Sequence, residues 1–211
     1  EPHWGAAVPG GATCYTSCME KPKALEEMSP EELGRLFPVS LSGHRLEWKS
    51  LFEAEKKRIM AGLSVGSNMQ LHHVGSTAIP GICAKPTIDM LLEVPPGCDP
   101  QGLQRAMKDL GYFFAAQPQK PPPHMMFMKG YSREGYRGQA FHVHVRFPRD
   151  HDELLFRDFL RRHPDVAQHY ARLKQRLQRA FEFDREGYTL WKSGFVRSVT
   201  ARARKERDSM L

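Results

Sequence analysis

The stretch HHVGSTAIPGICAKPTIDMLLEV occupies residues 72–94 and groups most of the chain's recognisable chemistry. It contains two short runs, 70–74 (which begins just before it) and 87–94, that are rich in apolar or β-branched side chains. Glycine and proline bound both runs, and this pattern is typical of strands. We therefore expect a strand, a loop and a second strand, with Asp89 inside the second strand.

A Gly-Ser turn followed by a carboxylate on the next strand predicts a phosphate site. Gly75 lets the backbone approach a phosphate closely, and the hydroxyls of Ser76 and Thr77 can donate hydrogen bonds to its oxygens. Asp89 can hold the Mg²⁺ that neutralises the phosphate charge. We therefore expect Gly75, Ser76 and Thr77 to bind phosphate and Asp89 to bind a metal ion.

The rest of the chain predicts a mixed α/β fold with a C-terminal helical region. Ser29 and Pro30 begin a short helix that ends before Pro38, and Glu32 is placed to close a capping box. The other expected elements are an amphipathic helix over 48–63, a helix near 99–110, strands at 111–116, 125–131 and 140–147, and helices after Pro148, with starts at 163–165 and 184–186.

The length and charge set broad limits on function. A chain of 211 residues with 40% hydrophobic side chains can bury a core without disulfides, which excludes a disulfide-stapled mini-protein. A net charge of +7 favours anionic partners such as nucleotides, phosphorylated metabolites or nucleic acid. No run approaches the roughly 18 apolar residues of a membrane helix, so we expect no membrane partner.

Residues 1–27 differ in composition from the rest of the chain. They are rich in glycine, alanine and proline and show no apolar period, so we expect a flexible extension before a single domain over 28–211. The four cysteines, Cys14, Cys18, Cys83 and Cys98, form neither metal knuckles nor a secreted-type disulfide framework. We therefore expect reduced thiols and a cytoplasmic protein.

The segment at 72–94 resembles the signature stretch of the GrpB family, with its His-x-Gly-Ser-Thr, Pro-Gly turn, Ala-Lys-Pro and Ile-Asp. Further similar segments extend the resemblance from about Met28 to about residue 205; they are MSPEELGRLFPV at 28–39, PPPHMMFMKGY at 121–131, FHVHVRF at 141–147, FRDFLRRHPDVAQHYARLK at 156–174 and DREGYTLWKSGF at 184–195. The resemblance implies a nucleotidyltransferase-like mixed sheet related to the polymerase β superfamily.

Active members of that superfamily carry two carboxylates one residue apart on the second strand, and together these hold two metal ions. This sequence has Asp89 followed two residues later by Leu91. Glu93 lies on the same strand face, but at about 13 Å from Asp89 it is too far away to share an ion. The usual two-metal nucleotidyl transfer is therefore in doubt.

Two histidines offer a substitute for the missing carboxylate. His142 and His144 alternate on one face of the predicted strand FHVHV, and beside Asp89 they would complete a site of two imidazoles and one carboxylate. Such a site suits a transition metal better than Mg²⁺. The alternative is that both histidines face solvent or form hydrogen bonds at a sheet edge.

Lys85 and His73 are the other catalytic candidates near the loop. Lys85 precedes a proline and can meet a phosphate or a carboxylate, or it can be a solvated loop lysine. His73 can act as a general base or bind phosphate, or it can simply bond to backbone. We expect His72 to point to the opposite face from the site.

The later part of the chain offers two further phosphate-binding lysines. We expect the helix with Lys192 to lie across the mouth of the cleft, and Lys129 to project from its edge. Loops at 118–127 and 129–139 are expected to cover the cleft. Helical aromatics such as Tyr170, Tyr188, Trp191 and Phe195 are expected in the core, and the tail ARARKERD at 201–208 is expected to be a frayed basic end.

These patterns lead to two hypotheses about function. The first is nucleotide-dependent transfer to a small-molecule acceptor, with a nucleoside triphosphate and a divalent metal as cofactors: Mg²⁺ or Mn²⁺, or a transition metal if the histidines are ligands. The second is a catalytically reduced fold that binds a nucleotide or RNA as a regulatory or interaction module. Leu91 is the feature that separates the two hypotheses. The sequence gives no oligomeric state.

Overall fold

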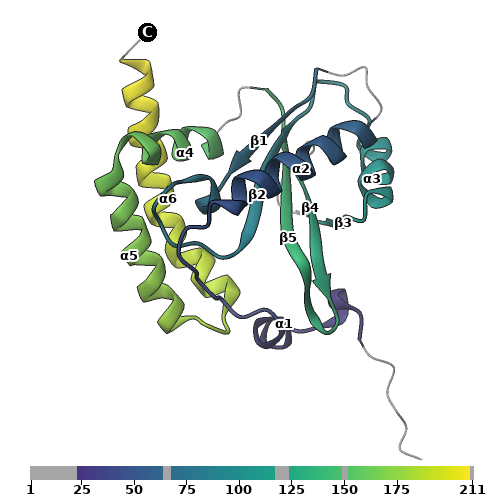
Figure 1. Cartoon of the computed structure of the whole chain (residues 1–211), viewed down its shortest axis with the longest axis horizontal. Helices are drawn as coiled ribbons and strands as arrows, with labels where there is room; N and C mark the ends of the chain where they lie inside the picture. The colour runs from purple at the N-terminus through teal and green to yellow at the C-terminus, as the bar shows by residue number, and fades with distance from the viewer. Residues whose placement is uncertain (1–22, 64–67, 117–123, 149–151, 210–211) are drawn as a thin grey trace, which may run out of the picture.

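A five-stranded mixed sheet forms the centre of the protein in the computed structural model, which describes residues 23–63, 68–116, 124–148 and 152–209 (Figure 1). The strands lie in the order β1-β2-β5-β4-β3. Their bounds are β1 Gln70–Val74, β2 Thr87–Glu93, β3 Phe113–Ala115, β4 Met125–Ser132 and β5 Gly135–Arg146. The expected mixed α/β class is therefore confirmed.

The register of the sheet decides which side chains share a face. β2 pairs antiparallel with β1, so that Asp89 lies opposite Val74, and it pairs parallel with β5, so that Asp89 lies beside His142. In the same register His144 lies beside Leu91. Because paired residues point to the same side, Asp89, His142 and His144 all share one face of the sheet.

Six α-helices and two short 3₁₀ helices, η1 and η2, surround the sheet in the described ranges. Their bounds are η1 Leu25–Glu27, α1 Pro30–Leu36, α2 Glu47–Gly62, η2 Ser76–Ala78, α3 Pro100–Asp109, α4 Asp152–Arg162, α5 Pro164–Ala180 and α6 Arg185–Asp208. The predicted capping box is present, since Ser29 and Glu32 each accept a hydrogen bond from the other's backbone amide. Asp99 and Asp184 cap α3 and α6 through their carboxylates.

The second face of the sheet packs on α2 and α3 and forms the main core. Trp48, Phe52 and Ile59 supply the buried stripe of α2, as the helical period predicts. They meet the alternate residues of β2, Ile88 and Met90 among them, which are fully buried. Each such side chain contributes about 1.5–3 kcal/mol of burial. This face holds the sheet together and leaves the other face for the site.

Helices α4, α5 and α6 form a separate layer with its own core, on the left of Figure 1. Ile79 and Ile82, from the loop between β1 and β2, are buried in this core together with Phe159 and Tyr170. Apolar burial therefore fixes the loop that follows the Gly-Ser turn. A single substitution such as Ile82→Ala would loosen it, because it would leave a cavity in this core.

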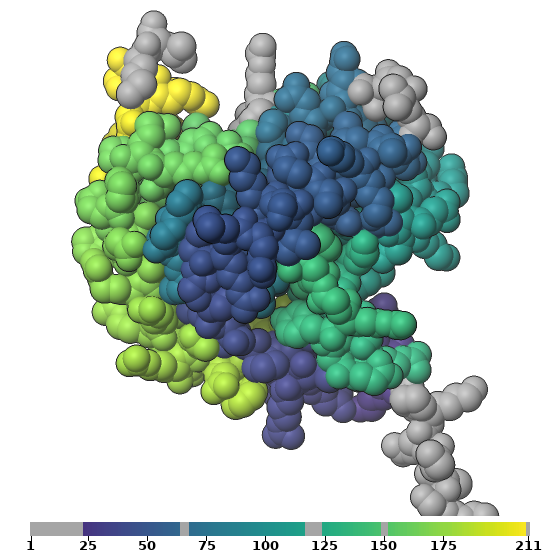
Figure 2. All heavy atoms as spheres, in the orientation of Figure 1, coloured from purple at the N-terminus to yellow at the C-terminus, as the bar shows by residue number. Residues whose placement is uncertain are grey.

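The segment after α1 ties the helical layer to the sheet. The amide of Val39 donates to the carbonyl of Glu182, and Ser42 forms an isolated antiparallel bridge with Ala84. In the space-filling view this dark blue stretch lies between the light green atoms of the helical layer and the green atoms of the strands β4 and β5 (Figure 2). The two layers therefore meet around Ala84, immediately before Lys85.

Four expectations about the elements need correction. Residues 129–139 form a β-hairpin and not a loop, because Tyr131 pairs with Tyr136 and Ser132 with Gly135. The strand expected at 111–116 is only β3, since the amide of Tyr112 still bonds to the C-terminal end of α3. The expected cover loop at 118–127 falls mostly outside the described residues.

The other two corrections concern α6. Residues 201–208 are helical to Asp208, and ion pairs of Arg204 with Asp152 and of Glu206 with Arg162 fasten them to α4. Trp191 is 65% exposed and does not belong to the core, whereas Tyr188 is buried as expected. The apolar stripe of α6 is thus wider than the surface that the helix buries.

No helix in the described ranges is long and apolar enough to cross a membrane.

We predict that a chain lacking residues 1–27 keeps its melting temperature within about 2 °C of the full chain. The described end of this segment reaches the domain through an exposed ion pair of Lys23 with Glu32, and pairs of this kind contribute about 0–1 kcal/mol. Ser29→Ala is the positive control, because losing the helix cap costs about 1 kcal/mol, or about 2–4 °C. Loss of cooperative unfolding in the truncated chain would contradict the extension hypothesis.

Candidate functional site

The site is built around a close approach of Asp89 to Gly75. Gly75 has φ +70°, in the left-handed region, and a Cβ placed on it would lie 2.8 Å from the Cβ of Asp89 and closer still to its carboxylate. Any other residue at position 75 would therefore be strained and would displace Asp89. The carboxylate lies directly against the turn that was predicted to bind phosphate.

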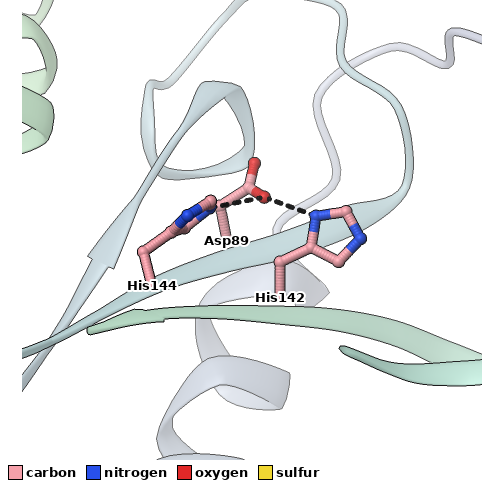
Figure 3. A group of neighbouring side chains, drawn as sticks. All are labelled: Asp89, His142 and His144. Carbon is pink, nitrogen blue, oxygen red and sulfur yellow. Dashed lines mark ion pairs between the residues drawn. The ribbon is translucent and has the colours of Figure 1, made fainter. Parts of the chain in front are cut away.

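Two histidines of β5 complete a cluster with this carboxylate, as Figure 3 shows. The Nδ1 atom of His142 lies 3.2 Å from Oδ1 of Asp89, and the Nε2 atom of His144 lies 3.9 Å from the same oxygen. All three candidate ligand atoms lie within 4.8 Å of one another. The predicted juxtaposition of Asp89, His142 and His144 is thus present in the structure.

The cluster's electrostatics favour an ionised carboxylate beside a neutral imidazole. Burial raises the pKa of Asp89, but hydrogen bonds from His142 and His144 outweigh it and hold that pKa well below its usual range. Burial lowers the pKa of His142, against the attraction of Asp89. A carboxylate and neutral imidazoles are the forms in which these side chains bind metal ions.

Tyr131 is a residue of the site that the sequence did not indicate. Its hydroxyl lies 2.7 Å from Nε2 of His142, on the side of the ring away from Asp89, and its ring stacks on the imidazole. A β-bulge between Lys129 and Tyr131 turns the tyrosine onto the Asp89 face. Simple alternation would have directed it to the other face, so sequence periodicity could not find it.

The position two residues after Asp89 holds an apolar side chain, Leu91, and not a second carboxylate. Leu91 is fully buried, and Glu93 interacts with His72 at 3.3 Å instead of with the cluster. Among the described residues, the candidate metal group consists of Asp89, His142 and His144 alone. In the described residues the group therefore offers one carboxylate and two imidazoles.

Two lysines lie close to the ring of Tyr188. The Nζ atoms of Lys85 and Lys192 lie 5.4 and 5.3 Å from the ring centre. Burial, followed by the charges of Lys192 and Arg185, lowers the pKa of Lys85 to about 7, while Asp89 acts in the opposite direction. This concentration of positive charge next to a carboxylate suits a metal-bound phosphate.

A hollow of about 750 Å³ adjoins the Gly-Ser turn between α4 and α6. Gly75, Tyr170 and Lys192 line it, together with Glu153 and Arg204 from its outer rim. Burial raises the pKa of Tyr170, partly offset by a hydrogen bond with Ser76. Of the expected phosphate residues, Gly75, Ser76, Lys85 and Lys192 therefore surround one region.

Lys174 is a second residue that sequence reasoning did not assign to the site. It is almost completely buried, donates a hydrogen bond to the carbonyl of Cys83 and lies 4.6 Å from the ring centre of Tyr170. Burial lowers its pKa to about 8. Its acceptor is a backbone carbonyl far away in the sequence, so no local pattern predicts the contact.

His73 and Thr77 do not join the cluster. His73 follows the opposite parity to Asp89 and stacks on Phe52 with 4.8 Å between ring centres. Its Nε2 lies 3.0 Å from the hydroxyl of Thr77, which donates to the carbonyl of Thr87. It is therefore His72 that shares the face of Asp89, and the expected orientation of these two histidines is wrong.

Lys129 is also on the wrong face for the cleft. It pairs with Phe141, and its Nζ lies 3.0 Å from the buried carboxylate of Glu55. Tyr112 and Arg58 donate to the same carboxylate. Lys129 therefore stabilises the packing of α2 on the sheet, because the buried charge of Glu55 needs these partners.

The sequence of the chain matches the GrpB protein family over residues 38–202. The chain belongs to the GrpB family. A GrpB-family relative from Pseudomonas aeruginosa, the UPF0157 protein PA4798, is 44% identical over 158 residues, which are 74% of this chain and 64% of the relative. The chain thus spans just under two thirds of that relative's length.

A solved structure of a GrpB protein supports the fold. The conserved protein GrpB from Enterococcus faecalis is 25% identical, with a TM-score of 0.69 over 80% of this chain and 99% of that one. More distantly, the Cid1 poly(U) polymerase is 10% identical, with a TM-score of 0.40 over 69% of this chain and 46% of that one. The range that matches the GrpB family, residues 38–202, contains the Gly-Ser turn, Asp89 and both histidines of β5.

We predict that His73 controls pH-dependent stability and not metal binding. Burial lowers its pKa from 6.5 to about 4; Arg157, Arg161 and His44 lower it further, and Asp89 opposes them. The folded state therefore favours neutral His73, and stability is lost as pH falls from about 6.5 towards 4. The loss should be about 1–3 kcal/mol.

Urea unfolding of wild-type protein and of His73→Gln at pH 7.5 and 5.0 measures this effect. The variant should lose less stability between the two pH values than the wild type does, and it should keep the wild-type metal content. His72→Gln is the neighbouring control. Equal losses in wild type and His73→Gln, or loss of metal from His73→Gln, would contradict this assignment.

Proposed function

We propose that this GrpB-family protein carries out a metal-assisted, nucleotide-dependent transfer to a small-molecule acceptor. The convergence of Asp89, His142 and His144 beside the Gly-Ser turn is the observation that supports it most. Lys85 and Lys192 add positive charge on the same side. Groups suited to phosphate recognition and to metal binding thus lie around one turn.

The donor set favours one transition-metal ion over a pair of Mg²⁺ ions. One carboxylate and two imidazoles suit Mn²⁺, Fe²⁺ or Zn²⁺, whereas Mg²⁺ prefers oxygen ligands. Leu91 removes the carboxylate that a second ion would need. When bound, a single ion would neutralise phosphate charge and polarise a phosphoryl oxygen. Any Mg²⁺ would depend on the nucleotide's own phosphates.

Tyr131 is the positioning residue for this metal site. When a metal ion is bound, Nδ1 of His142 would offer it a lone pair in place of the hydrogen bond that this atom donates to Asp89 in the metal-free protein. The ring proton would then sit on Nε2 and be donated to the tyrosine oxygen. Burial raises the pKa of Tyr131 to about 12, so it stays a neutral phenol and accepts that hydrogen bond. The hydrogen bond fixes both the tautomer and the orientation of the imidazole.

The phosphate groups would be held by the turn and by the two lysines. Gly75 lets the carboxylate of Asp89 lie against the turn, and Ser76 offers a hydroxyl to a phosphate held there. Lys85, with a pKa of about 7 in the free protein, would regain its full charge next to a phosphate. The hollow beside Gly75 offers a position for the nucleoside or the acceptor.

Leu91 also supports a second candidate function. With one protein carboxylate at the site, the fold can bind a nucleotide or RNA and signal its presence without turning it over. Such a regulatory module would need Gly75, Lys85 and Lys192 but not an intact metal cluster. Metal dependence of turnover therefore separates the two functions.

We predict that each ligand of the cluster is required for metal binding. His142→Ala combined with His144→Ala should eliminate a bound transition metal, because one carboxylate remains. Asp89→Asn should abolish both metal binding and turnover, and it should also lower stability at neutral pH, because the ionised carboxylate is held by both histidines. Tyr131→Phe should weaken metal affinity by about 10-fold, because the ring remains but its hydrogen bond to His142 is lost. Metal analysis after loading with Mn²⁺ or Zn²⁺, and calorimetry with ATP, GTP, CTP and UTP, measure these effects.

His72→Ala is the matched control for these variants, since it removes an imidazole from the same sheet face outside the cluster. It should keep metal content and nucleotide affinity. Retained metal in the double histidine variant would show that the histidines are not ligands. Full metal-dependent turnover by Asp89→Asn would overturn the catalytic assignment and favour the regulatory module.

A further inference from the structure

The geometry points to a second ligand site, for a small organic phosphate, at the outer edge of β1. A hollow of about 720 Å³ opens there between α2 and α4, which flank β1 in Figure 1. Lys49 and Lys56 of α2 and Arg157 and Arg161 of α4 line it, against a single lining carboxylate, that of Glu53. Four cations from two helices thus face one space.

The two arginines are fixed in position but incompletely neutralised. Arg157 donates to the carbonyl of His73 and Arg161 to that of Ala78, so both guanidinium groups are anchored at the end of β1. They share one carboxylate, that of Asp158, at 2.7 and 3.7 Å. Two guanidinium groups against one carboxylate leave a net positive charge, which favours an anion such as phosphate in the hollow.

The two lysines have no carboxylate partner within the described part of the chain. Lys49 is exposed, and Lys56 is half-buried with its Nζ 5.8 Å from the ring centre of Phe52. Lys57, the next residue of the same helix, is exposed and lies outside the hollow. Helix α2 therefore carries lysines that line the hollow and a neighbouring lysine that does not, and the latter can serve as a control.

His44 also lines the hollow, and its ring packs edge-on against Trp48. Its Nδ1 atom is closed off from solvent, so the ring contributes shape to the hollow and not a hydrogen bond to the ligand.

Part of the remaining lining is apolar, which indicates a second property of the ligand. Phe52, Leu71 and Pro80 line the hollow, and Leu46 at its rim is 88% exposed. Bare inorganic phosphate would leave this surface uncovered. The combination of a cationic rim and an apolar wall therefore favours a phosphate group attached to an aromatic or aliphatic body.

The hollow adjoins the loop between β1 and β2, which also carries the Gly-Ser turn of the candidate site. His73 and Thr77 line it, and the 3.0 Å contact between them joins it to the turn at Gly75. A ligand in the hollow would therefore restrain the Gly-Ser loop through His73 and Thr77. This effect on the cleft depends on the proposed function, whereas binding in the hollow does not.

Calorimetry with phenyl phosphate on the full chain tests the inference, with phenol as the uncharged probe. Wild-type protein should bind phenyl phosphate at two sites. Lys49→Ala combined with Lys56→Ala should weaken one of them by at least 10-fold, while Lys192→Met should weaken the other. The charge-matched control is Lys57→Ala with Lys108→Ala, both exposed and outside the hollow. It should change neither site by more than about twofold.

Unchanged binding in the Lys49/Lys56 variant, or an equal loss in the charge-matched control, would overturn the inference. Binding of phenol as tight as that of phenyl phosphate would overturn it too, because the cations would then contribute nothing. Metal content of the Lys49/Lys56 variant separates this test from that of the proposed function, since the hollow contains none of the three metal-ligand candidates. That content should equal the wild-type value.

Discussion

The carboxylate of Asp89 occupies the space that a side chain at position 75 would need. The remaining features of the site depend on this contact. The turn must contain glycine, the loop after it must be anchored, and His142 and His144 must stand on the neighbouring strand to hold the buried carboxylate ionised. A polar cluster of this kind is stable only because the opposite sheet face forms a continuous core.

The two faces of the sheet explain what the sequence could and could not predict. A short apolar run bounded by proline identified β2, and an alternating pattern identified β5 and placed His142 and His144 on one face; the parallel register of the two strands then brings them to Asp89. The histidines of β1 were assigned to the wrong faces. Their orientation depends on the register of β1 against β2, which the folded loop between them sets and local periodicity does not.

Departures from regular structure account for the other misses at the site. Tyr131 reaches His142 because of a β-bulge, and Lys129 turns towards Glu55 because it precedes that bulge. Trp191 fits a helical apolar stripe yet remains exposed, since the stripe of α6 is wider than the surface it buries. Helix starts were predicted well, because capping is local chemistry within four residues. Long-range contacts of single polar atoms were not predicted, because no local pattern encodes them.

The central claim is that one transition-metal ion is held by Asp89 and the two histidines of β5, in place of a pair held by carboxylates. Crystals grown with Mn²⁺ and a non-hydrolysable nucleoside triphosphate, measured at the manganese absorption edge, test it most directly. The account predicts one anomalous peak bonded to Asp89, His142 and His144, with the phosphates against Gly75 and Ser76. An empty cluster with manganese bound elsewhere, or two ions held without the histidines, would contradict it.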